Sequence, residues 1–467
     1  MREDTIVGIA SGMGGGIGII RISGEDSFQL AGRIFRTKKY LSNKEEKWEE
    51  DYFEKKESHT IHYGFIVDEE ENSVDEVMVL LMKGPNSYTR EDVVEIDSHG
   101  GSYVLQKILK ILIKKGGRLA EPGEFTKRAF LNGRIDLSQA EAVMKMISSE
   151  NDFALHSAIH QLEGSVSKYI EEIRQKILHN LGYIEAALDD PEHMSLEGFA
   201  DELLNETKEE VKQLNDLLDN FDNGRMKSEG INTVIVGKPN AGKSSLMNLM
   251  LDEDRAIVTN IAGTTRDILE EKVYLGNIIL NLIDTAGIHK TEDVVENMGV
   301  NKAVDYLEKA DFIIYVVDSS EELSEADDQI VQLLKNKSGV ILLNKTDLEK
   351  VVSEEEIQDK LNWDLIAFST KTKDGLKKLE DYIKTSFLKG DISYNNQIYI
   401  TNLRHKEAVE SAKRSLEQVV QTIEDGMPED FYTIDMMDAY KQLGLINGTT
   451  ASEDLVNKIF KEFCMGK

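Results

Sequence analysis

The chain has 467 residues, and its 86 Asp and Glu against 55 Lys and Arg give a formal net charge of −31. A chain of this length is too long for one hydrophobic core and predicts about three domains. The negative charge excludes a protein that coats nucleic acid indiscriminately, so any RNA contact must come from a local basic patch or from a partner.

Cysteine content and the start of the chain indicate the compartment. Cys464 is the one cysteine, which excludes an internal disulfide and favours a reducing environment. No apolar run approaches the roughly 18 residues of a membrane span, and acidic residues stand where a signal peptide would need an apolar block. We therefore expect a cytoplasmic, soluble protein with no membrane span.

Residues 1–118 are expected to form an α+β domain, because short β-rich segments alternate with one helix. The helix is expected over 103–115, where lysines follow one face and apolar residues the other. The acidic run 45–51 is interpreted as a solvated loop rather than a partner site. The expected strands are 5–7, 18–22, 60–67, 77–82 and 93–96.

Residues 119–228 and 387–467 have long helical patterns, with a break between two helices expected at Pro191. Residues 229–386 lie between them and alternate apolar strands with helices. The simplest architecture inserts this region as an α/β domain into one helical domain, because the ends of a compact domain usually lie close together. Two separate helical pieces are the alternative. The helical patterns cover 140–181, 199–221, 402–425 and 452–463.

The segment 237–245, Gly-Lys-Pro-Asn-Ala-Gly-Lys-Ser-Ser, matches the phosphate-loop pattern G-x-x-x-x-G-K-[ST]. It follows a β-branched run at 231–236 and precedes a helix expected over 245–250, which is the context that the pattern requires. Backbone N–H groups converge on phosphate oxygens here, Lys243 adds a positive charge, and Ser244 offers a hydroxyl to Mg²⁺. The segment predicts a nucleotide site in a Ras-like, doubly wound α/β domain.

Three further segments have the order that a GTPase needs. Asp284 and Gly287 follow an apolar strand and suit Mg²⁺ held through water and contact with a γ-phosphate. Asp347 ends an N-K-x-D motif, and its carboxylate accepts hydrogen bonds from the N1 and N2 donors of guanine. Adenine lacks this donor pair, and leaving the carboxylate unpaired costs on the order of 2 to 5 kcal/mol, so guanine is the expected base. Residues 369–371 are expected to provide a backbone contact to the guanine oxygen.

The glutamine that orients the attacking water in small signalling GTPases is absent from its usual place. That place holds Ile288 and then His289. Asn240 and the loop 258–267 suggest instead that carbonyl oxygens hold a monovalent cation beside the phosphates. Thr265, in the same loop, is placed to be the second Mg²⁺ ligand.

These motifs resemble the TrmE-Era-EngA-YihA-Septin-like class of GTPases over the α/β domain. Outside it, the segments 18–24, 122–133 with 136–142, and 464–467 resemble the MnmE (TrmE) family of tRNA modification GTPases, so the resemblance spans the chain. It implies that hydrolysis of GTP to GDP and phosphate drives addition of a carboxymethylaminomethyl-type group to the wobble uridine of certain tRNAs. The implied partner is MnmG (GidA), in a heterotetramer.

Two other functions stay open at this point. The first is an Era-like ribosome-assembly or regulatory GTPase that acts only through binding. Era-type proteins lack the N-terminal segment and the terminal Cys-Met-Gly-Lys, which argues against it. The second is a folate-binding scaffold without catalysis, against which the intact phosphate loop speaks.

The resemblance also implies residue roles. The N-terminal domain is expected to form a homodimer and to bind 5-formyltetrahydrofolate or a related tetrahydrofolate, through Arg21, Glu95, Arg134 and Lys467. The GTPase domains are expected to pair across the nucleotide when K⁺ is bound, through Asn240, Thr259, Ile261 and Thr264. The catalytic candidates are Glu296, which orients water, with Lys243 and Cys464. The GTP-binding residues are Asn240, Ala241, Gly242, Lys243, Ser244, Ser245, Thr259, Asn260, Ile261, Ala262, Gly263, Thr264, Thr265, Asp284, Thr285, Ala286, Gly287, Asn344, Lys345, Asp347, Ser369, Thr370 and Lys371.

Several positions depart from the family pattern or have a simpler interpretation. Arg134 stands where lysine is common, which keeps the charge but changes its geometry, and Arg90 stands where glycine is usual. Cys464 is either a redox or catalytic thiol or a small apolar residue on the last helix. His99 is a fold residue or a catalyst, and Glu296 a water-orienting or an ordinary surface acid.

One stretch in this acidic chain is basic. Residues 102–134 contain eight Lys or Arg against two Glu. They form either an RNA-facing patch or a solvated helical surface.

Overall fold

The computed structural model describes residues 4–43, 48–251, 270–275, 278–283, 306–335, 337–387, 398–464 and 466. Contacts divide the chain into two compact units, each assembled from separate stretches of sequence. The domain boundaries expected near residues 118, 228 and 386 stay predictions. Unit 1 comprises Met1–Ile147, Ile159–Glu210 and Ser411–Lys467, and unit 2 comprises Ser148–Ala158 and Val211–Glu410.

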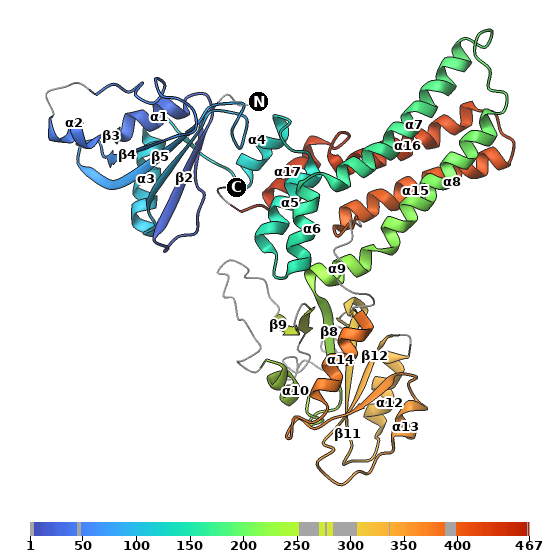
Figure 1. The fold of residues 1–467 in the computed structure, drawn as a ribbon. Coiled ribbons are helices and arrows are strands. Elements are labelled where there is room, and N and C mark those ends of the chain that lie inside the picture. Colours follow the sequence, from blue (N-terminus) through green and yellow to red (C-terminus); the bar gives the residue numbers. More distant parts are fainter. Residues whose placement is uncertain are drawn as a thin grey trace, which may run out of the picture. The chain divides into compact units, whose positions relative to one another are not determined.

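Unit 1 contains a seven-stranded sheet in the order β3-β4-β5-β6-β2-β1-β7 (Figure 1). Neighbouring strands are antiparallel except β1 and β7, which are parallel. All five segments expected to be strands are strands here, since their β-branched residues suit a pleated, half-buried surface. The strands are β1 (Ile6–Ile9), β2 (Ile17–Ser23), β3 (Phe35–Arg36), β4 (Thr60–Val67), β5 (Ser73–Met82), β6 (Val93–His99) and β7 (Arg118–Leu119).

Three helices accompany this sheet in the described residues 4–43 and 48–118, where the sequence predicted one. The predicted helix is α3 (Ser102–Lys114), and α1 (Ser27–Ile34) and α2 (Lys38–Ser42) are additional. The prediction of one helix is wrong because α1 and α2 have eight and five residues, too few for a periodicity to show. Apolar residues of α1 and α3 pack with the inner face of the sheet in one core.

Part of the segment predicted to be a solvated acidic loop is anchored to this core. Glu49 and Glu50 are exposed, as expected. The Trp48 ring, however, lies 6.1 Å from the Phe35 ring between centroids, and its Nε1 donates a hydrogen bond to the Gly32 carbonyl at 2.8 Å. The solvated-loop interpretation is therefore wrong at Trp48, because burial of a large indole outweighs the charges beside it.

The rest of unit 1 is helical and combines segments from both halves of the chain. α7 (Ser165–Asp189) packs against α16 (Asp430–Asn447), and the Arg174 guanidinium lies 4.2 Å from the centroid of the Tyr440 ring. The packing favours one helical domain over two separate helical pieces. α7 ends beside the break predicted at Pro191. A second apolar cluster joins α4 (Glu124–Leu131), α5 (Leu137–Ser148) and α17 (Glu453–Lys461).

Unit 2 contains a six-stranded sheet in the order β13-β12-β11-β8-β10-β9. All neighbouring strands are parallel except β9 and β10. Helices cover both faces, which confirms a doubly wound α/β domain inserted between helical segments (Figure 1). The strands are β8 (Ile231–Val236), β9 (Glu270–Leu275), β10 (Ile278–Ile283), β11 (Phe312–Asp318), β12 (Gly339–Asn344) and β13 (Asp364–Ala367).

The helices of unit 2 bury alternate residues of the same strands. On one face, α10 (Lys243–Met250) and α14 (Leu376–Phe387) pack against residues such as Ile314 and Leu342. On the other, α12 (Glu325–Leu334) and α13 (Glu354–Gln358) pack against neighbours such as Ile313. Because successive side chains of a strand point to opposite faces, an apolar run without polar alternation is buried on both sides. The remaining described helices are α6 (Asp152–Leu162), α8 (Phe199–Asp219), α9 (Phe221–Glu229) and α15 (Leu403–Glu424).

Candidate functional site

The phosphate loop connects β8 to α10 at the carboxyl edge of the parallel strands, where open α/β sheets bind ligands. Its turn requires unusual backbone angles, with φ of 64° at Asn240 and 106° at Gly242. A Cβ at Gly242 would lie 2.1 Å from Nδ2 of Asn344, so only glycine fits there. Ser244 and Ser245 lie exposed in the first turn of α10.

The Lys243 ammonium lies inside the curve of this loop. Its Nζ donates hydrogen bonds to the carbonyl oxygens of Gly237 and Lys238, both at 2.7 Å. The loop therefore holds a positive charge at its centre, beside the N-terminus of α10, whose dipole adds to the attraction for an anion. This arrangement suits the phosphates of a nucleotide.

The N-K-x-D motif begins at the end of β12 and is bonded directly to the phosphate loop. Asn344 is buried, and its Nδ2 donates to the Ala241 carbonyl at 2.8 Å. Its Oδ1 accepts a hydrogen bond from the backbone N–H of Thr370 at 3.1 Å. One amide side chain thus connects all three predicted nucleotide-binding segments that the structure describes.

Asp347 lies beside the segment that follows β13. Ser369 Oγ donates to its Oδ1 at 2.8 Å, and Lys371 Nζ lies 3.9 Å from its Oδ2. The Ser369 hydroxyl also accepts a hydrogen bond from the N–H of Thr372 at 3.2 Å. These contacts orient the carboxylate that the sequence assigns to guanine recognition.

Asp318 was missed in the sequence, although it ends a parallel strand as Asn344 does. It is 3% exposed, and its Oδ2 lies 2.5 Å from Nζ of Lys345. Burial by itself would raise the pKa of Asp318, but hydrogen bonds from Lys345 and Ser320 outweigh it and hold the pKa below its ordinary value. The charged pair fixes Lys345, which adopts a φ of 64°.

A second cluster forms on the N-terminal sheet from three of the four residues predicted to bind folate. Arg21 and Glu95 are paired in register on β2 and β6, and Arg21 Nε donates to Glu95 Oε1 at 2.7 Å. The guanidinium carbons of Arg21 and Arg134 lie 4.9 and 4.5 Å from the centroid of the Tyr88 ring. Tyr88, which the sequence did not single out, therefore brings the two cations together.

This cluster contains buried polar atoms that the described residues do not satisfy. Arg21 Nη1 and Asp97 Oδ1 are buried and have no hydrogen-bond partner among those residues. Burial, with the nearby Glu95 carboxylate, raises the pKa of Asp97. A ligand with both hydrogen-bond donors and an anionic group would satisfy these atoms.

Comparison with known proteins covers the whole chain. The model of the MnmE helical domain matches residues 137–464, and that of the GTP-binding protein TrmE N-terminus matches residues 5–134. The chain belongs to the MnmE family. The tRNA modification GTPase MnmE of Lachnoclostridium phytofermentans is 52% identical over 100% of both chains. The tRNA modification GTPase MnmE of Thermoanaerobacter pseudethanolicus is 48% identical over 100% of both chains. The MnmE of Clostridioides difficile is 46% identical over 100% of this chain and 99% of the C. difficile protein.

Some of the site residues predicted from the GTPase motifs or from the MnmE resemblance lie outside the described part of the chain, and their roles stay predictions. They include part of each predicted metal site, the γ-phosphate segment, the water-orienting candidate and the terminal lysine. These residues are Thr259, Asn260, Ile261, Ala262, Gly263, Thr264, Thr265, Asp284, Thr285, Ala286, Gly287, Glu296 and Lys467.

The C-terminal motif of this MnmE-family chain reaches the N-terminal sheet. Gly466 has a φ of 87°, and a Cβ there would lie 1.9 Å from the carbonyl oxygen of Ile9 on β1. Cys464 accepts a hydrogen bond at its carbonyl from the N–H of Gly123 at 3.3 Å, and its thiol is free and exposed. The backbone of Cys464 and Gly466 is therefore packed, whereas the Cys464 side chain is exposed and lies beyond the end of the last helix, which disfavours the interpretation as an apolar residue of that helix.

Arg90, a departure from the MnmE pattern, and His99, for which a fold role and a catalytic role were both open, have a structural account. Arg90 adopts a φ of 62°, which is the left-handed conformation that glycine favours, and its Nη1 donates to the Asn132 carbonyl at 2.9 Å. This bond holds the turn that glycine would form freely. His99 donates its backbone N–H to Asp75, and its Nδ1 lies 2.7 Å from Asp75 Oδ1, which raises the pKa of His99. His99 thus fastens β6 to β5.

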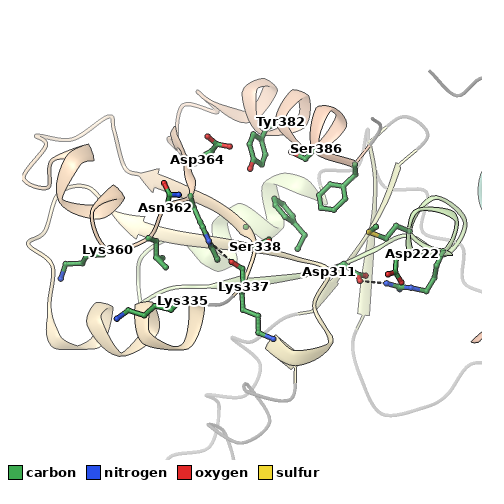
Figure 2. Close-up of a pocket in the computed structure, with 17 residues that line it drawn as sticks. Asp222, Asp311, Lys335, Lys337, Ser338, Lys360, Asn362, Asp364, Tyr382 and Ser386 are labelled. Atoms are coloured by element: carbon green, nitrogen blue, oxygen red, sulfur yellow. Dashed lines mark hydrogen bonds and ion pairs between the residues drawn. The ribbon is translucent and has the colours of Figure 1, made fainter. Parts of the chain in front are cut away.

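A cavity of about 800 Å³ lies in unit 2 near the amino ends of β11, β12 and β13, at the edge opposite the nucleotide segments (Figure 2). Arg225 and Asp311 pair on its wall, and Trp363 Nε1 donates to the Lys337 carbonyl at 3.0 Å. Since none of the predicted site residues lines it, the cavity is separate from the nucleotide site. No helix in the described part of the chain is long and apolar enough to span a membrane.

Proposed function

We propose that this protein hydrolyses GTP to GDP and phosphate and couples the reaction to modification of a tRNA wobble uridine. The observation that carries the proposal is the hydrogen bond from Asn344 to Ala241, which joins the base-recognition segment to the phosphate loop. A base and a triphosphate chain belonging to one nucleotide must bind at a fixed separation. A direct bond between the two segments supports that separation.

Base selection falls to Asp347 in this proposal. Its carboxylate, oriented by Ser369, accepts the paired N1 and N2 donors of guanine, which adenine does not offer. At the other end, the backbone amides of the loop and the Lys243 ammonium bind the phosphates. GTP is therefore preferred over ATP at both equilibrium binding and turnover.

Metal ions complete the proposed site. Mg²⁺, held by Ser244 and Thr265, would neutralise the charge that develops on the phosphates during hydrolysis. We propose that K⁺, held by Asn240, Thr259, Ile261 and Thr264, supplies the positive charge beside the phosphates that an arginine side chain supplies in other GTPases. Asn240 is the one of these residues that the structure describes; it lies in the phosphate loop with a φ of 64° and is exposed, so its side chain is open to a cation. Glu296 is proposed to orient the attacking water in place of the missing glutamine.

The experiment that tests this part is a steady-state measurement of GTP hydrolysis in KCl and in NaCl at matched ionic strength, with ATP as the competing substrate. We expect turnover of GTP only, with at least about tenfold stimulation by K⁺. Hydrolysis of ATP at the same rate would contradict the base assignment. Equal rates in both salts would contradict the K⁺ site alone.

For the cluster on the N-terminal sheet, we propose 5-formyltetrahydrofolate or a related tetrahydrofolate as the ligand. The pterin ring carries donors that suit Glu95 and the raised-pKa carboxyl of Asp97, and the glutamate tail carries anions that suit Arg21 and Arg134. The bound folate would supply a one-carbon unit to the modification. Lys467 is the fourth proposed ligand, one residue beyond Gly466, which packs on β1.

The coupled reaction has proposed partners. The protein acts in the cytoplasm as a homodimer through its N-terminal domain and forms a heterotetramer with MnmG. The product is a carboxymethylaminomethyl-type group on the tRNA. Mass spectrometry of tRNA nucleosides, after incubation with both proteins, GTP and folate, tests it. GTP hydrolysis without any modified uridine would favour the Era-like alternative, in which the GTPase acts only through binding.

A further inference from the structure

Lys238, the second residue of the phosphate loop, makes a contact that the nucleotide site does not require. Its Nζ lies 2.9 Å from Oδ2 of Asp327 on α12. The side chains are 13% and 1% exposed, so the ion pair is largely withdrawn from water. Nothing in the phosphate-loop pattern prescribes this residue, because the pattern leaves its position open.

Asp327 is itself held by several hydrogen bonds. Asp327 is the third residue of α12 and completes the capping box that begins at Ser324. Its Oδ2 accepts hydrogen bonds from the backbone N–H of Ser324 at 2.8 Å and from the Ser324 hydroxyl at 2.9 Å. Its Oδ1 accepts from the buried Tyr315 hydroxyl at 3.2 Å. Burial alone would raise the pKa of Asp327, but the bonds from Ser324 and Lys238 outweigh it and lower the pKa. The carboxylate is therefore ionised and anchored to both α12 and β11.

The backbone of Lys238 faces the other way, toward the phosphate site. Its carbonyl oxygen is one of the two that accept hydrogen bonds from Lys243 Nζ. Lys238 is thus connected through its side chain to a buried anchor and through its backbone to the ammonium that binds phosphate. A shift of Asp327 or loss of the pair would change where the Lys238 carbonyl lies, and with it the position of Lys243.

We propose that Lys238 and Asp327 are positioning residues for GTP hydrolysis, which fasten the phosphate loop to α12 and so hold Lys243 in place. The inference rests on the proposed GTPase function. The physical reason is that a displacement of about 1 Å in a positioning group costs on the order of 100-fold in rate. A buried carboxylate cannot be left without its cation at small cost, so the pair resists such a displacement.

The test compares Lys238→Met and Asp327→Asn with the unchanged protein in steady-state GTP hydrolysis. We expect kcat to fall about tenfold or more in each, with KM changing less, because the transition state depends on the placement of Lys243 more than the ground state does. Lys238→Arg, which can still pair with Asp327, should recover much of the activity. The double variant should lose little more than either single one, since both remove one interaction.

Asp328→Asn is the matched control. Asp328 is the next residue of α12 and pairs with Lys360, which is not part of the phosphate loop. Its loss should leave kcat within about twofold of the unchanged protein, because an exposed ion pair contributes little. Thermal unfolding, monitored by circular dichroism for each variant, separates loss of fold from loss of rate.

Three outcomes would overturn the inference. One is unchanged kcat in folded Lys238→Met, a second is equal loss in Asp328→Asn, and a third is full additivity in the double variant. If Asp327→Asn does not fold, Lys238→Met still decides, since its side chain lies at the margin of the buried region. Absence of GTP hydrolysis in the unchanged protein would instead contradict the proposed function itself.

Discussion

The nucleotide site and the N-terminal cluster satisfy their polar groups in different ways. In the nucleotide site, Lys243 is bonded to loop carbonyls and Asn344 to Ala241, so the described groups are paired within the protein. In the N-terminal cluster, Arg21 Nη1 and Asp97 Oδ1 are buried without a partner among the described residues. The first site is organised by its own backbone, whereas the second leaves capacity that a ligand can satisfy.

Because of this difference, ligand binding is expected to affect protein stability differently at the two sites. A nucleotide at the first site meets an ammonium that the loop carbonyls of Gly237 and Lys238 already hold in place, so little reorganisation is needed on binding or during hydrolysis. A ligand at Arg21 and Asp97 relieves groups whose burial is costly, so it should stabilise the fold of unit 1 as well as bind. Three substitutions test this contrast, in descending order of expected effect, and a fourth tests a buried carboxyl outside both sites.

Lys243→Ala should reduce GTP turnover by at least about 100-fold, because it removes the charge at the centre of the loop. Steady-state hydrolysis and titration with a fluorescent GTP analogue measure the loss. Lys335→Ala is the control, since Lys335 lines the cavity at the opposite edge of the sheet. Normal turnover in Lys243→Ala would mean that the phosphate site is elsewhere.

Asp347→Asn should weaken GTP binding by about 30-fold or more, which corresponds to about 2 kcal/mol for a lost charge-assisted contact. Xanthine has a carbonyl oxygen where guanine has the 2-amino group, so an amide at residue 347 should favour xanthosine triphosphate. Competition binding with both nucleotides measures the change. Glu349→Gln, at an exposed neighbouring carboxylate, should change neither affinity. An unchanged preference for guanine in Asp347→Asn would contradict the assignment.

Glu95→Gln should weaken binding of 5-formyltetrahydrofolate by about tenfold, because it breaks the ion pair that orients Arg21. Isothermal titration calorimetry measures the affinity. GTP affinity should be unchanged, as expected for residues without shared contacts. Glu54→Gln, at an exposed acid of the same unit, is the matched control. Equal folate affinity in both variants would remove the N-terminal cluster from the proposal.

Glu210→Gln should have the smallest effect, on stability alone. Glu210 is 3% exposed, its Oε1 has no partner among the described residues, and burial raises its pKa from 4.5 to about 8, while Lys176 opposes and Glu206 adds to the shift. A raised pKa means that the folded state binds the proton more tightly. Stability of the unchanged protein should therefore fall as pH rises from 4.5 toward 8.

The substitution removes this titration. Glu210→Gln should therefore raise the unfolding free energy by roughly 1–3 kcal/mol near pH 8.5 and have almost no effect near pH 4.5. Thermal unfolding across this pH range measures the difference. The adjacent exposed Glu209→Gln should stay within about 0.5 kcal/mol of the unchanged protein at every pH. A gain that does not depend on pH would contradict the buried, protonated state of Glu210.

Much of the nucleotide site was predictable from sequence, because its motifs are short and each begins within a few residues of the end of a strand. Lys243 and Asp347 are identified by neighbours in the chain, and the order of parallel strands then brings them to one edge of the sheet. Asp318 and Asp327 were not predicted. Local sequence gives only their places, Asp318 at the end of a strand and Asp327 in a capping box, and not their ion pairs, because the partners Lys345 and Lys238 are distant in sequence.

In the N-terminal cluster, too, the sequence did not reveal residues whose role depends on distant contacts. The family resemblance supplied Arg21, Glu95 and Arg134, but not Tyr88 or Asp97. Tyr88 reaches the two arginines only after a turn packs against β2, and Asp97 becomes costly only when the sheet buries it. The short helix α1 was missed for a related reason, because its apolar residues form a face only against the sheet. The five-residue α2 buries none of its residues, so it has no apolar face that a sequence pattern could reveal.

The sequence by itself determined which chemistry the chain carries: a phosphate loop, a carboxylate for guanine, alternating strands and helices, and long helical flanks. Those features depend on residue type and on short sequence spacings. Such spacings can be interpreted because side chains repeat every 2 residues in a strand and every 3.6 in a helix. The tertiary structure decided which charges pair, which polar atoms are buried without partners, and how the flanks pack as α7 against α16. These depend on distance and burial between residues far apart in the sequence, and folding alone sets both.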